Sequence, residues 1–442
     1  MTMKNDWIDH IDRDIMPFVE YEGYENRYPA KEVTEITPEF ANELRTVSSK
    51  LFKIFCKVTD VFQKCGDEFM ESMEIPPKMR QFLRRKNALG TPTWLSRFDF
   101  VMDRDNKLHM VEINADTPCA IVEAYYANTI ACRYNNLTDP NLGAYEGLKN
   151  WLKDMFLKAY KPVIDLHTGK FSAQKPFVFS CFHDYKEDYG NTMFLMNAMR
   201  EAVGAMYPPH MIVFETFYNL RVDDNTGAIV LPDGREAGAI YRLHPMELLI
   251  EEVSEDGFEL GTEMMTGYMN GEFEMFNPPE AIIMQSKGFQ ALVWALAHSE
   301  ASKDLFTSDE LETIECYLLP SYFERDFVDN DDKKWLNKPI WGREGCGITL
   351  RENGEEVYKR EVECEEDIVC RHSATKMIQK YVEQPQRILE TDEGRIEGYY
   401  TFSCFMQGYK PAAVYARFSP ECIAGTEAYW APLGYKTKTN LI

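Results

Sequence analysis

The sequence predicts a mixed α/β protein, and three segments of the chain support this prediction. The N-terminal part is helical in pattern, because Pro38 precedes apolar residues that recur every three or four positions over 40–62. Two short apolar runs, 98–102 and 108–113, flank a turn and predict a β-hairpin. From residue 175 onwards, strand and helix patterns alternate, which is typical of a small parallel α/β unit.

The other elements follow from the same patterns. Helices are expected at about 119–135, 142–161 and 190–203, and strands at 177–181, 211–214, 239–242, 281–284 and 377–382. A strand, a glycine-rich loop and a second strand are predicted over 338–348, and another hairpin over 398–406 and 412–418. Because the chain has 442 residues, it is too long for a single core, and several domains are expected.

Composition narrows the classes of function. The net charge of −24 argues against nucleic acid as a main partner and is compatible with a cationic substrate such as a polyamine, although acidity for solubility alone is the simpler explanation. The eleven cysteines include no C-x-x-C pair, so neither a disulfide framework nor a zinc site is predicted, and a cytoplasmic location is expected. The acidic N-terminus is no signal peptide, and no run of about 18 apolar residues predicts a membrane span.

The first hairpin carries one group of candidate functional residues. Arg97 and Asp99 lie two positions apart on its first strand, and Glu112 and Asn114 lie two apart on its second. Because side chains of a strand alternate between faces, the members of each pair share a face. The three oxygen donors among them suit Mg²⁺ that is held jointly by protein and phosphate. The polar outer face of an ordinary hairpin is the alternative.

The glycine-rich segment carries a second group. Lys338 precedes Gly342, Gly345 and Gly347. Glycines let backbone N–H groups approach an anion closely, and a lysine neutralises phosphate charge. The spacing differs from that of P-loop NTPases and of dinucleotide-binding loops, and a glycine-rich hairpin turn is the alternative.

Taken together, these segments resemble the synthetase half of the glutathionylspermidine synthase family. The matching segments, in family order over most of the chain, are R-F-D (97–99), E-I-N-A-D-T-P (112–118), Y-R-L-H-P-M-E (241–247), L-L-P-S-Y-F (318–323), K-P-I-W-G-R-E-G-C-G-I (338–348), Gln379 before Pro385, and Y-A-R-F-S (415–419). No amidase-like half is recognised, and the chain is expected to start directly with the synthetase part. The resemblance implies an ATP-grasp-like fold, and the position of Glu112 and Asn114 before Lys338 matches the circularly permuted arrangement of this family.

The resemblance also implies a division of the chain. The expected regions are an N-terminal helical region packed on the ligase core (1–90), a metal- and substrate-binding part of the core (91–170), a small α/β and helical region that is pre-ATP-grasp-like (171–330), and a nucleotide-binding lid with the C-terminal part of the core (331–442).

The implied activity is that of an ATP-dependent C–N ligase, which forms an amide through an acyl phosphate. ATP and Mg²⁺ are the implied cofactors, and the implied substrates are a peptide or thiol-peptide carboxylate and a polyamine or other amine. The implied roles are metal binding by Asp99, Glu112 and Asn114; ATP binding by Lys338, Gly342, Arg343, Glu344, Gly345, Gly347, Lys376 and Gln379; catalysis by Arg97 and Arg417; and substrate binding by Asp116, Thr117, Cys119 and Glu247.

Some interpretations stay open at this point. Relatives often carry Ser or Thr where this chain has Cys119, and a thiol is a weaker hydrogen-bond partner, so glutathione itself is in doubt as the substrate. A solvated helix position is equally compatible with Glu247, and His244 is interpreted as structural. A non-catalytic ATP-grasp-like protein that binds a nucleotide or peptide is the main alternative function, and a metal hydrolase ranks last because no His-rich site is present. No nucleic-acid or membrane partner is expected, and a homo-oligomer is compatible with the sequence.

Overall fold

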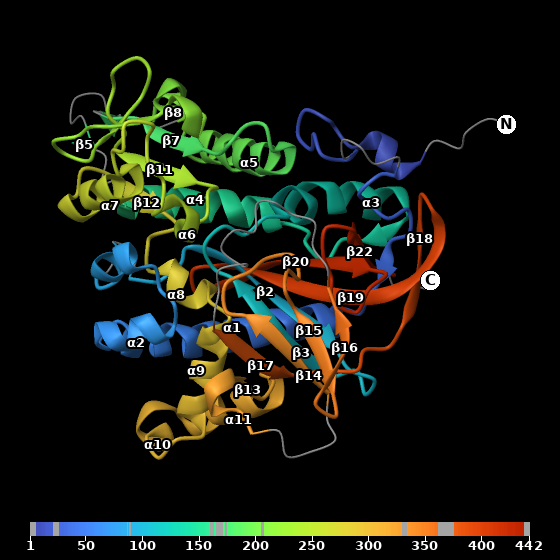
Figure 1. Cartoon of the computed structure of the whole chain (residues 1–442). Coiled ribbons are helices and arrows are strands. Elements are labelled where there is room, and N and C mark those ends of the chain that lie inside the picture. Colours follow the sequence, from blue (N-terminus) through green and yellow to red (C-terminus); the bar gives the residue numbers. More distant parts are fainter. Residues whose placement is uncertain are drawn as a thin grey trace.

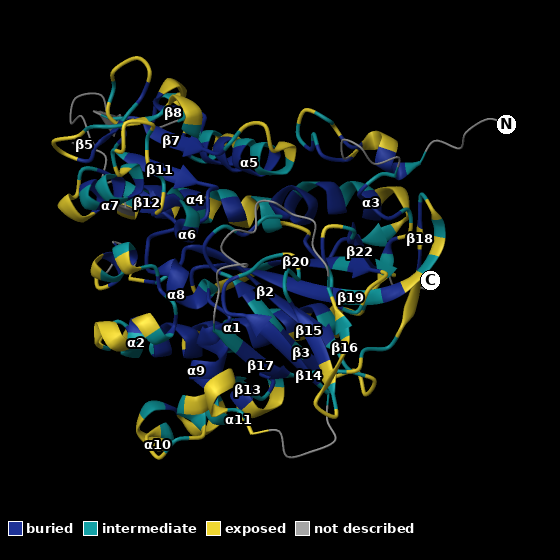
Figure 2. Ribbon diagram, viewed as in Figure 1, coloured by how far each residue is buried: buried dark blue, intermediate teal, exposed yellow. Residues whose placement is uncertain are grey.

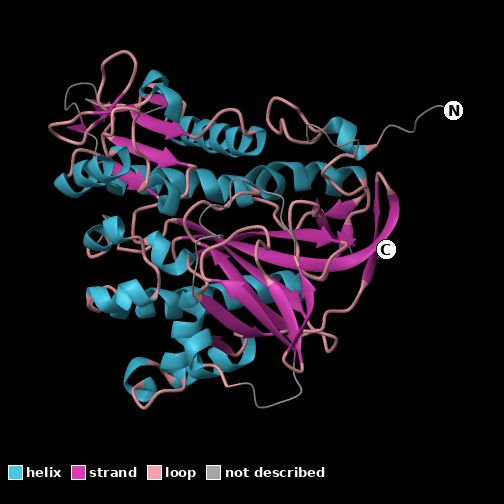
Figure 3. Ribbon diagram, in the orientation of Figure 1, coloured by secondary structure: helices cyan, strands magenta, loops and turns pink. Residues whose placement is uncertain are grey.

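The computed structural model describes residues 6–20, 26–85, 87, 90–159, 163–164, 171–172, 175–204, 207–328, 334–360 and 375–436 (Figure 1). These residues form two larger antiparallel sheets and one parallel sheet, with helices packed around them (Figure 3). The strands of the three sheets are mostly buried, and exposed residues gather on the outer helices and loops (Figure 2). The predicted mixed α/β class is therefore confirmed.

The first sheet is antiparallel, with strands in the order β21-β20-β19-β2-β3 and with β18 paired to β19. Its strands are β2 (Leu95–Met102), β3 (Leu108–Asn114), β18 (Arg387–Thr391), β19 (Gly394–Gln407), β20 (Lys410–Ser419) and β21 (Tyr429–Trp430). Both predicted hairpins are confirmed, and the pairing of β2 with β19 joins them side by side. Arg97 lies opposite Asn114, and Asp99 lies opposite Glu112.

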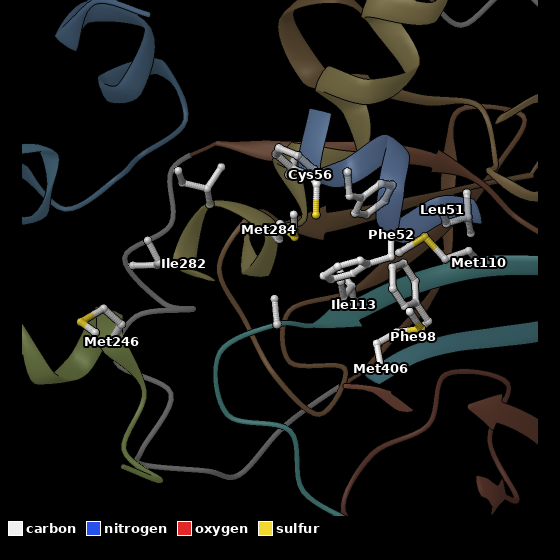
Figure 4. Close-up of a cluster of buried hydrophobic side chains, with 14 of the residues drawn as sticks. Leu51, Phe52, Cys56, Phe98, Met110, Ile113, Met246, Ile282, Met284 and Met406 are labelled. Atoms are coloured by element: carbon white, nitrogen blue, oxygen red, sulfur yellow. The ribbon is translucent and has the colours of Figure 1, made fainter. Parts of the chain in front are cut away.

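A β-bulge in β3 decides which of its residues face the core. The pairing register shifts between Asp99 and Phe100 of β2, so one residue of β3 is left over at this point. Met110 and Ile113 therefore both lie in the apolar core although they are three positions apart (Figure 4). Glu112 is left on the opposite, polar face of the sheet.

Helix α1 (Pro38–Phe62) covers the apolar face of this sheet. It begins where the sequence predicts, because Thr37 caps its first turn through a side-chain hydrogen bond. The ring of Phe52 contacts Phe98 of β2 with a centroid distance of 6.5 Å (Figure 4). The ring of Phe55 contacts the same side chain with a centroid distance of 5.6 Å. Since this face is filled by side chains, the face that carries Arg97 and Asp99 is the one available for a functional site.

The second antiparallel sheet has the order β13-β17-β14-β15-β16. Its strands are β13 (Ser321–Phe323), β14 (Lys334–Pro339), β15 (Thr349–Glu352), β16 (Glu355–Lys359) and β17 (Lys376–Lys380). The glycine-rich segment joins β14 to β15, as the sequence predicts. A loop held at both ends by paired strands has a defined position over the sheet from which it emerges.

The third sheet is parallel throughout, in the order β12-β11-β7-β8, which confirms the predicted small α/β unit. Its strands are β7 (Phe177–Ser180), β8 (Ile212–Phe214), β11 (Ala239–Arg242) and β12 (Glu274–Phe276), and the helices around it are α4 (Ala144–Ala159), α5 (Lys186–Val203), α6 (Met246–Leu249) and α7 (Leu260–Asn270). The last two residues of the predicted helix at 142–161 lie outside the described residues.

The prediction of a strand at 281–284 is wrong, because these residues form helix α8 (Ala281–Gln285). All four are buried, and a short run that is apolar on every side has no period that separates a strand from a helix.

The remaining α-helices, π-helical turn and strands are α2 (Asp67–Ser72), α3 (Asn128–Tyr134), α9 (Gly288–Ala297), α10 (Ser302–Leu305), α11 (Ser308–Tyr317), a π-helical turn (Glu123–Ala127), β1 (Thr34–Glu35), β4 (Leu137–Thr138), β5 (Val163–Ile164), β6 (Phe171–Ser172), β9 (Arg221–Val222), β10 (Ile229–Val230) and β22 (Leu433–Lys436). Within the described ranges, no helix is both long enough and apolar enough to cross a membrane.

Candidate active site

A cavity lies between the two antiparallel sheets. Its empty volume is about 770 Å³, and it is partly open to solvent. Glu112 and Arg417 line it from the first sheet, and Lys338 lines it from the second. Lys287, which precedes α9, and Lys380 of β17 also line the cavity, as does Glu344 of the glycine-rich loop, so four cationic and two acidic residues surround it. The excess of cations over carboxylates at the cavity favours a polyanionic ligand.

Asp99 is the centre of the polar face of the first sheet. Arg97 forms two parallel hydrogen bonds with it, Nε to Oδ1 and Nη2 to Oδ2, each of 2.8 Å. Arg417 Nη2 and Asn114 Nδ2 also donate to Oδ2, at 3.0 and 3.3 Å. Burial alone would raise the pKa of Asp99, but the charge and hydrogen bonds of Arg97, together with the charge of Arg417, outweigh burial and lower the pKa. Asp99 is therefore an ionised carboxylate whose oxygens are fully engaged.

Glu112 is the accessible carboxylate of this face, with 31% of its side chain exposed. Its Oε1 lies 3.6 Å from Arg417 Nη2, and its Oε2 lies 3.8 Å from Lys287 Nζ. Neither distance is that of a short hydrogen bond, so both oxygens of Glu112 remain able to bind a cation.

The donor set only partly fits the predicted magnesium site. Across the described part of the chain, no group of three or more His, Cys, Asp or Glu side chains is arranged to hold a metal ion. Glu112 fits, and Asn114 fits through its carbonyl oxygen, because its Nδ2 points to Asp99. Asp99 joins them only if an arginine moves away from it. Phosphate oxygens of a ligand are needed to complete the coordination, which is the usual manner of Mg²⁺ binding in nucleotide sites.

Lys338 and Gln379 form a buried pair on the second sheet. Lys338 Nζ donates to Gln379 Oε1 at 2.7 Å. Gln379 is fixed in this orientation because its amide donates to Gln290 Oε1 at 3.0 Å and to Ser321 Oγ at 3.1 Å. Burial lowers the pKa of Lys338 to about 8, Glu112 opposes this change, and the nearby Lys287 adds to it. Gln379 therefore positions the lysine in this structure.

Lys287 is a site residue that the sequence reasoning missed. Its Nζ donates to the carbonyl oxygen of Gly342 at the start of the glycine-rich loop, and its backbone N–H donates to the carbonyl of Ile340. The signal in the sequence is a single lysine in a short polar interruption between two apolar runs. That signal is weak, because a surface turn between two helices has the same pattern.

Lys376 is not brought to the cavity. It pairs with Pro339 at the start of β17, whereas Lys338 pairs with Met377. Because directly opposed residues of antiparallel strands share a face, Lys376 and Lys338 lie on opposite faces of the sheet. Its assignment to ATP binding stays a prediction, and the geometry does not favour it.

The glycine-rich loop has the backbone shape that its glycines allow. Gly345 and Gly347 have φ angles of +75° and +67°. A Cβ added to Gly345 would lie 3.0 Å from the carbonyl oxygen of Ala424 and 2.7 Å from Arg360 Cδ, so no larger residue fits without a shift. Gly345 and its neighbour Glu344 line the cavity. The backbone of the loop therefore lies close enough to contact a ligand there.

A second contact ties the loop to the parallel α/β unit. The side chain of Arg343 forms an ion pair with Glu247 of α6. Glu247 is buried, and its Oε2 has no hydrogen-bond partner among the described residues. The alternative of a solvated helix position is therefore excluded for Glu247, which lies between the loop and the unit, whereas its assignment to substrate binding stays a prediction.

Three of the four residues predicted to bind the substrate, Asp116, Thr117 and Cys119, occupy the connection after β3. Asp116 is buried and forms an ion pair with Arg242 of β11, and it also accepts the backbone N–H of Met246 at 2.8 Å. Asp116 therefore joins the first sheet to the parallel unit, which explains its burial. Thr117 and Cys119 are half-buried.

Cys119 has the surroundings of an unreactive thiol. Its Sγ lies 3.8 Å from Asp188 Oδ1, and burial, together with this carboxylate, raises its pKa well above the usual value. Its carbonyl oxygen accepts a hydrogen bond from Arg97 Nη1 at 2.9 Å. The backbone at this position therefore holds the arginine, whereas the side chain stays a neutral thiol.

Comparisons with known proteins show the family and the fold of this chain. The family model described as "Glutathionylspermidine synthase preATP-grasp" matches residues 1–434. A Haemophilus influenzae protein named "Putative acid--amine ligase" is 25% identical over 300 residues, which are 66% of this chain. The aligned part spans 64% of the length of that curated relative. The structure of a glutathione synthetase-like effector from Globodera pallida, in its apo form, matches 96% of this chain and 95% of its own, with a TM-score of 0.55 and 11% identity. This last likeness is one of fold alone.

Proposed function

Since the chain belongs to the glutathionylspermidine synthase preATP-grasp family, we propose that it is an ATP-dependent carboxylate–amine ligase with a circularly permuted ATP-grasp fold. The observation that carries this proposal is the cavity between two antiparallel sheets, with lysines from one side and a carboxylate and an arginine from the other. The name of the Haemophilus influenzae relative supports the same class of reaction. The substrates are a peptide or thiol-peptide carboxylate and a polyamine or other amine.

ATP binds in the cavity with its phosphates toward the cations. Lys338 and Lys287 neutralise phosphate charge, and the backbone of the glycine-rich loop covers the phosphates. Lys287 takes the place that the sequence alone suggested for Lys376, because its ammonium group is already at the cavity. Gln379 acts by holding Lys338 at the cavity.

Glu112 and Asn114 would hold Mg²⁺ together with phosphate oxygens of the ligand, and Asp99 would join them only where Arg97 or Arg417 releases it. When bound, the ion neutralises the charge of the phosphates during phosphoryl transfer. In this structure the oxygens of Asp99 are engaged by Arg97 and Arg417.

The two arginines stabilise the reacting phosphate. The acid substrate attacks the γ-phosphate, ADP leaves, and an acyl phosphate forms; the amine then attacks the acyl carbon, phosphate leaves, and an amide is formed. Arg97 and Arg417 bind the charged oxygens of the acyl phosphate through their planar guanidinium groups. The loop excludes water, since an acyl phosphate is otherwise hydrolysed.

The test is an ADP-release screen of small peptides and thiol peptides crossed with diamines and polyamines, with the mass of each product measured. We expect one acid–amine pair to release ADP and to give a product lighter by one water than the sum of the two. Glu112→Gln serves as the matched inactive variant, because it keeps the side-chain shape. ATP binding without turnover for any pair would favour a non-catalytic binding protein, and hydrolysis without ATP would favour a hydrolase.

A further inference from the structure

Glu123 is a buried carboxyl group that the proposed reaction does not use. It begins the π-helical turn Glu123–Ala127, and none of its surface is exposed. Its Oε2 has no hydrogen-bond partner among the described residues. Burial raises the pKa of Glu123 to about 8, and the nearby Glu187 adds to this effect. Both a π-helical turn and an unsatisfied buried polar atom are costly, and both are concentrated at functional positions.

A chain of hydrogen bonds leads from Glu123 to the first sheet. The hydroxyl of Tyr28 donates to Glu123 Oε1 at 3.0 Å, and the hydroxyl groups of Tyr28 and Tyr415 lie 2.9 Å apart. A tyrosine has a single hydroxyl proton, and that of Tyr28 is given to Glu123. The three groups therefore form one continuous hydrogen-bonded chain between the first sheet and the carboxyl group.

The chain ends beneath Arg97. Tyr415 lies on β20, opposite Ser403 of β19, which in turn lies opposite Asp99 of β2. The guanidinium carbon of Arg97 is 5.7 Å from the centroid of the Tyr415 ring, which is within the range of a cation–π contact. The ring thus supports one side of the guanidinium group, while Asp99 binds its edge.

We propose that Glu123, Tyr28 and Tyr415 form a positioning chain that holds the guanidinium plane of Arg97 for the acyl phosphate. This inference rests on the proposed function and deepens it. When a phosphate draws Arg97 from Asp99, the arginine loses two of its hydrogen bonds. The ring of Tyr415 then holds the guanidinium plane of Arg97 in its orientation. The hydroxyl chain keeps the ring from turning. None of the three residues is among those that line the cavity, so all three act through Arg97.

Conservative variants separate this role from ordinary packing. Tyr415→Phe and Tyr28→Phe keep the rings and remove one link each, so we expect kcat to fall about tenfold, with the KM for ATP unchanged. Tyr400→Phe is the matched control, because its hydroxyl makes a similar 2.9 Å link between the N-terminal segment and the same sheet, to Thr34. The control is expected to keep the kcat of the wild type.

Glu123 itself is tested by two substitutions. Glu123→Gln keeps an oxygen that accepts from Tyr28, so we expect it to retain most of the kcat. The Met side chain of Glu123→Met has a similar length but no oxygen acceptor, so we expect its kcat to fall as far as that of Tyr415→Phe. If both variants keep the wild-type kcat, or if Tyr400→Phe loses as much as Tyr415→Phe, the positioning chain is refuted.

A second measurement tests the positioning chain and does not depend on enzymatic turnover. The Nε–H of Arg97 is bound to Asp99 Oδ1, and its exchange with solvent can be followed by NMR in protein with ¹⁵N-labelled arginine. We expect faster exchange in Tyr415→Phe and Glu123→Met than in Tyr400→Phe, and equal rates would overturn the inference. If the wild type turns over no acid–amine pair, the proposed function fails, and the exchange rates still decide whether the chain positions Arg97.

Discussion

Raising the pH from 7 to 9 is expected to weaken ATP binding about tenfold, because Lys338 loses its charge in this interval. Its pKa is about 8 in the folded protein, since the ammonium group is buried between the sheets. About nine tenths of the molecules then carry the charge at pH 7 and about one tenth at pH 9. If ATP binds only the charged form, the ratio is a factor of about ten in Kd, or about 1.4 kcal/mol.

Raising the pH changes ATP affinity and the stability of the free protein in opposite directions. The pKa of Lys338 is lowered from 10.5, so the unfolded chain binds more protons than the folded one between about pH 8 and 10.5. The contribution of Lys338 to stability therefore rises as the pH increases through this window. A loss of ATP affinity above pH 8 is thus distinct from alkaline unfolding.

The assay is calorimetric titration of the protein with ATP and Mg²⁺ at pH 7, 8 and 9, in buffers that differ in ionisation enthalpy, so that proton uptake is also measured. At pH 9 we expect close to one proton to be taken up for each ATP bound. Lys338→Arg is the control, because arginine stays charged at pH 9 and should remove the pH dependence. A Kd that is constant from pH 7 to 9 in the wild type, or an equal slope in Lys338→Arg, would refute the reasoning.

Four further outcomes are expected. Glu112→Gln should keep the melting temperature and lower the rate of ADP release by at least about 10²-fold, because one charged contact to the transition state is lost; near-normal turnover would make Glu112 an ordinary surface residue. Gly345→Val should fold but bind ATP poorly in the same titration, since its φ of +75° and the close contacts around it leave no room for a branched side chain; outright unfolding in circular dichroism would show a purely structural turn. Arg417→Ala should bind ATP almost normally and form more ADP per amide than the wild type, and an unchanged ratio would remove Arg417 from the mechanism. Asp116→Ala should lower the free energy of unfolding, measured with urea, by about 3–5 kcal/mol, because the charge of Arg242 is left buried and unpaired. A decrease under about 1 kcal/mol would show that the ion pair is solvated.

The sequence by itself determined the local elements that carry the site. Period-two patterns predicted the hairpin of Arg97 and Asp99, and the three glycines predicted the loop after Lys338; both predictions are confirmed. The resemblance to the glutathionylspermidine synthase family is confirmed as well. These features depend on neighbours within a few positions, which is the range over which backbone and side-chain preferences act. The catalytic and metal roles and the proposed domain limits stay predictions.

Only the tertiary structure decided which charges meet. Arg417 reaches Asp99 across 318 residues of chain, and Lys287 reaches the glycine-rich loop across 55. The bulge in β3 and the register of β17 set the faces of Glu112 and Lys376, and neither feature has a pattern in the sequence. The physical reason is that pairing between distant strands is selected by the packing of whole sheets, so the partners of a buried charge depend on the complete fold.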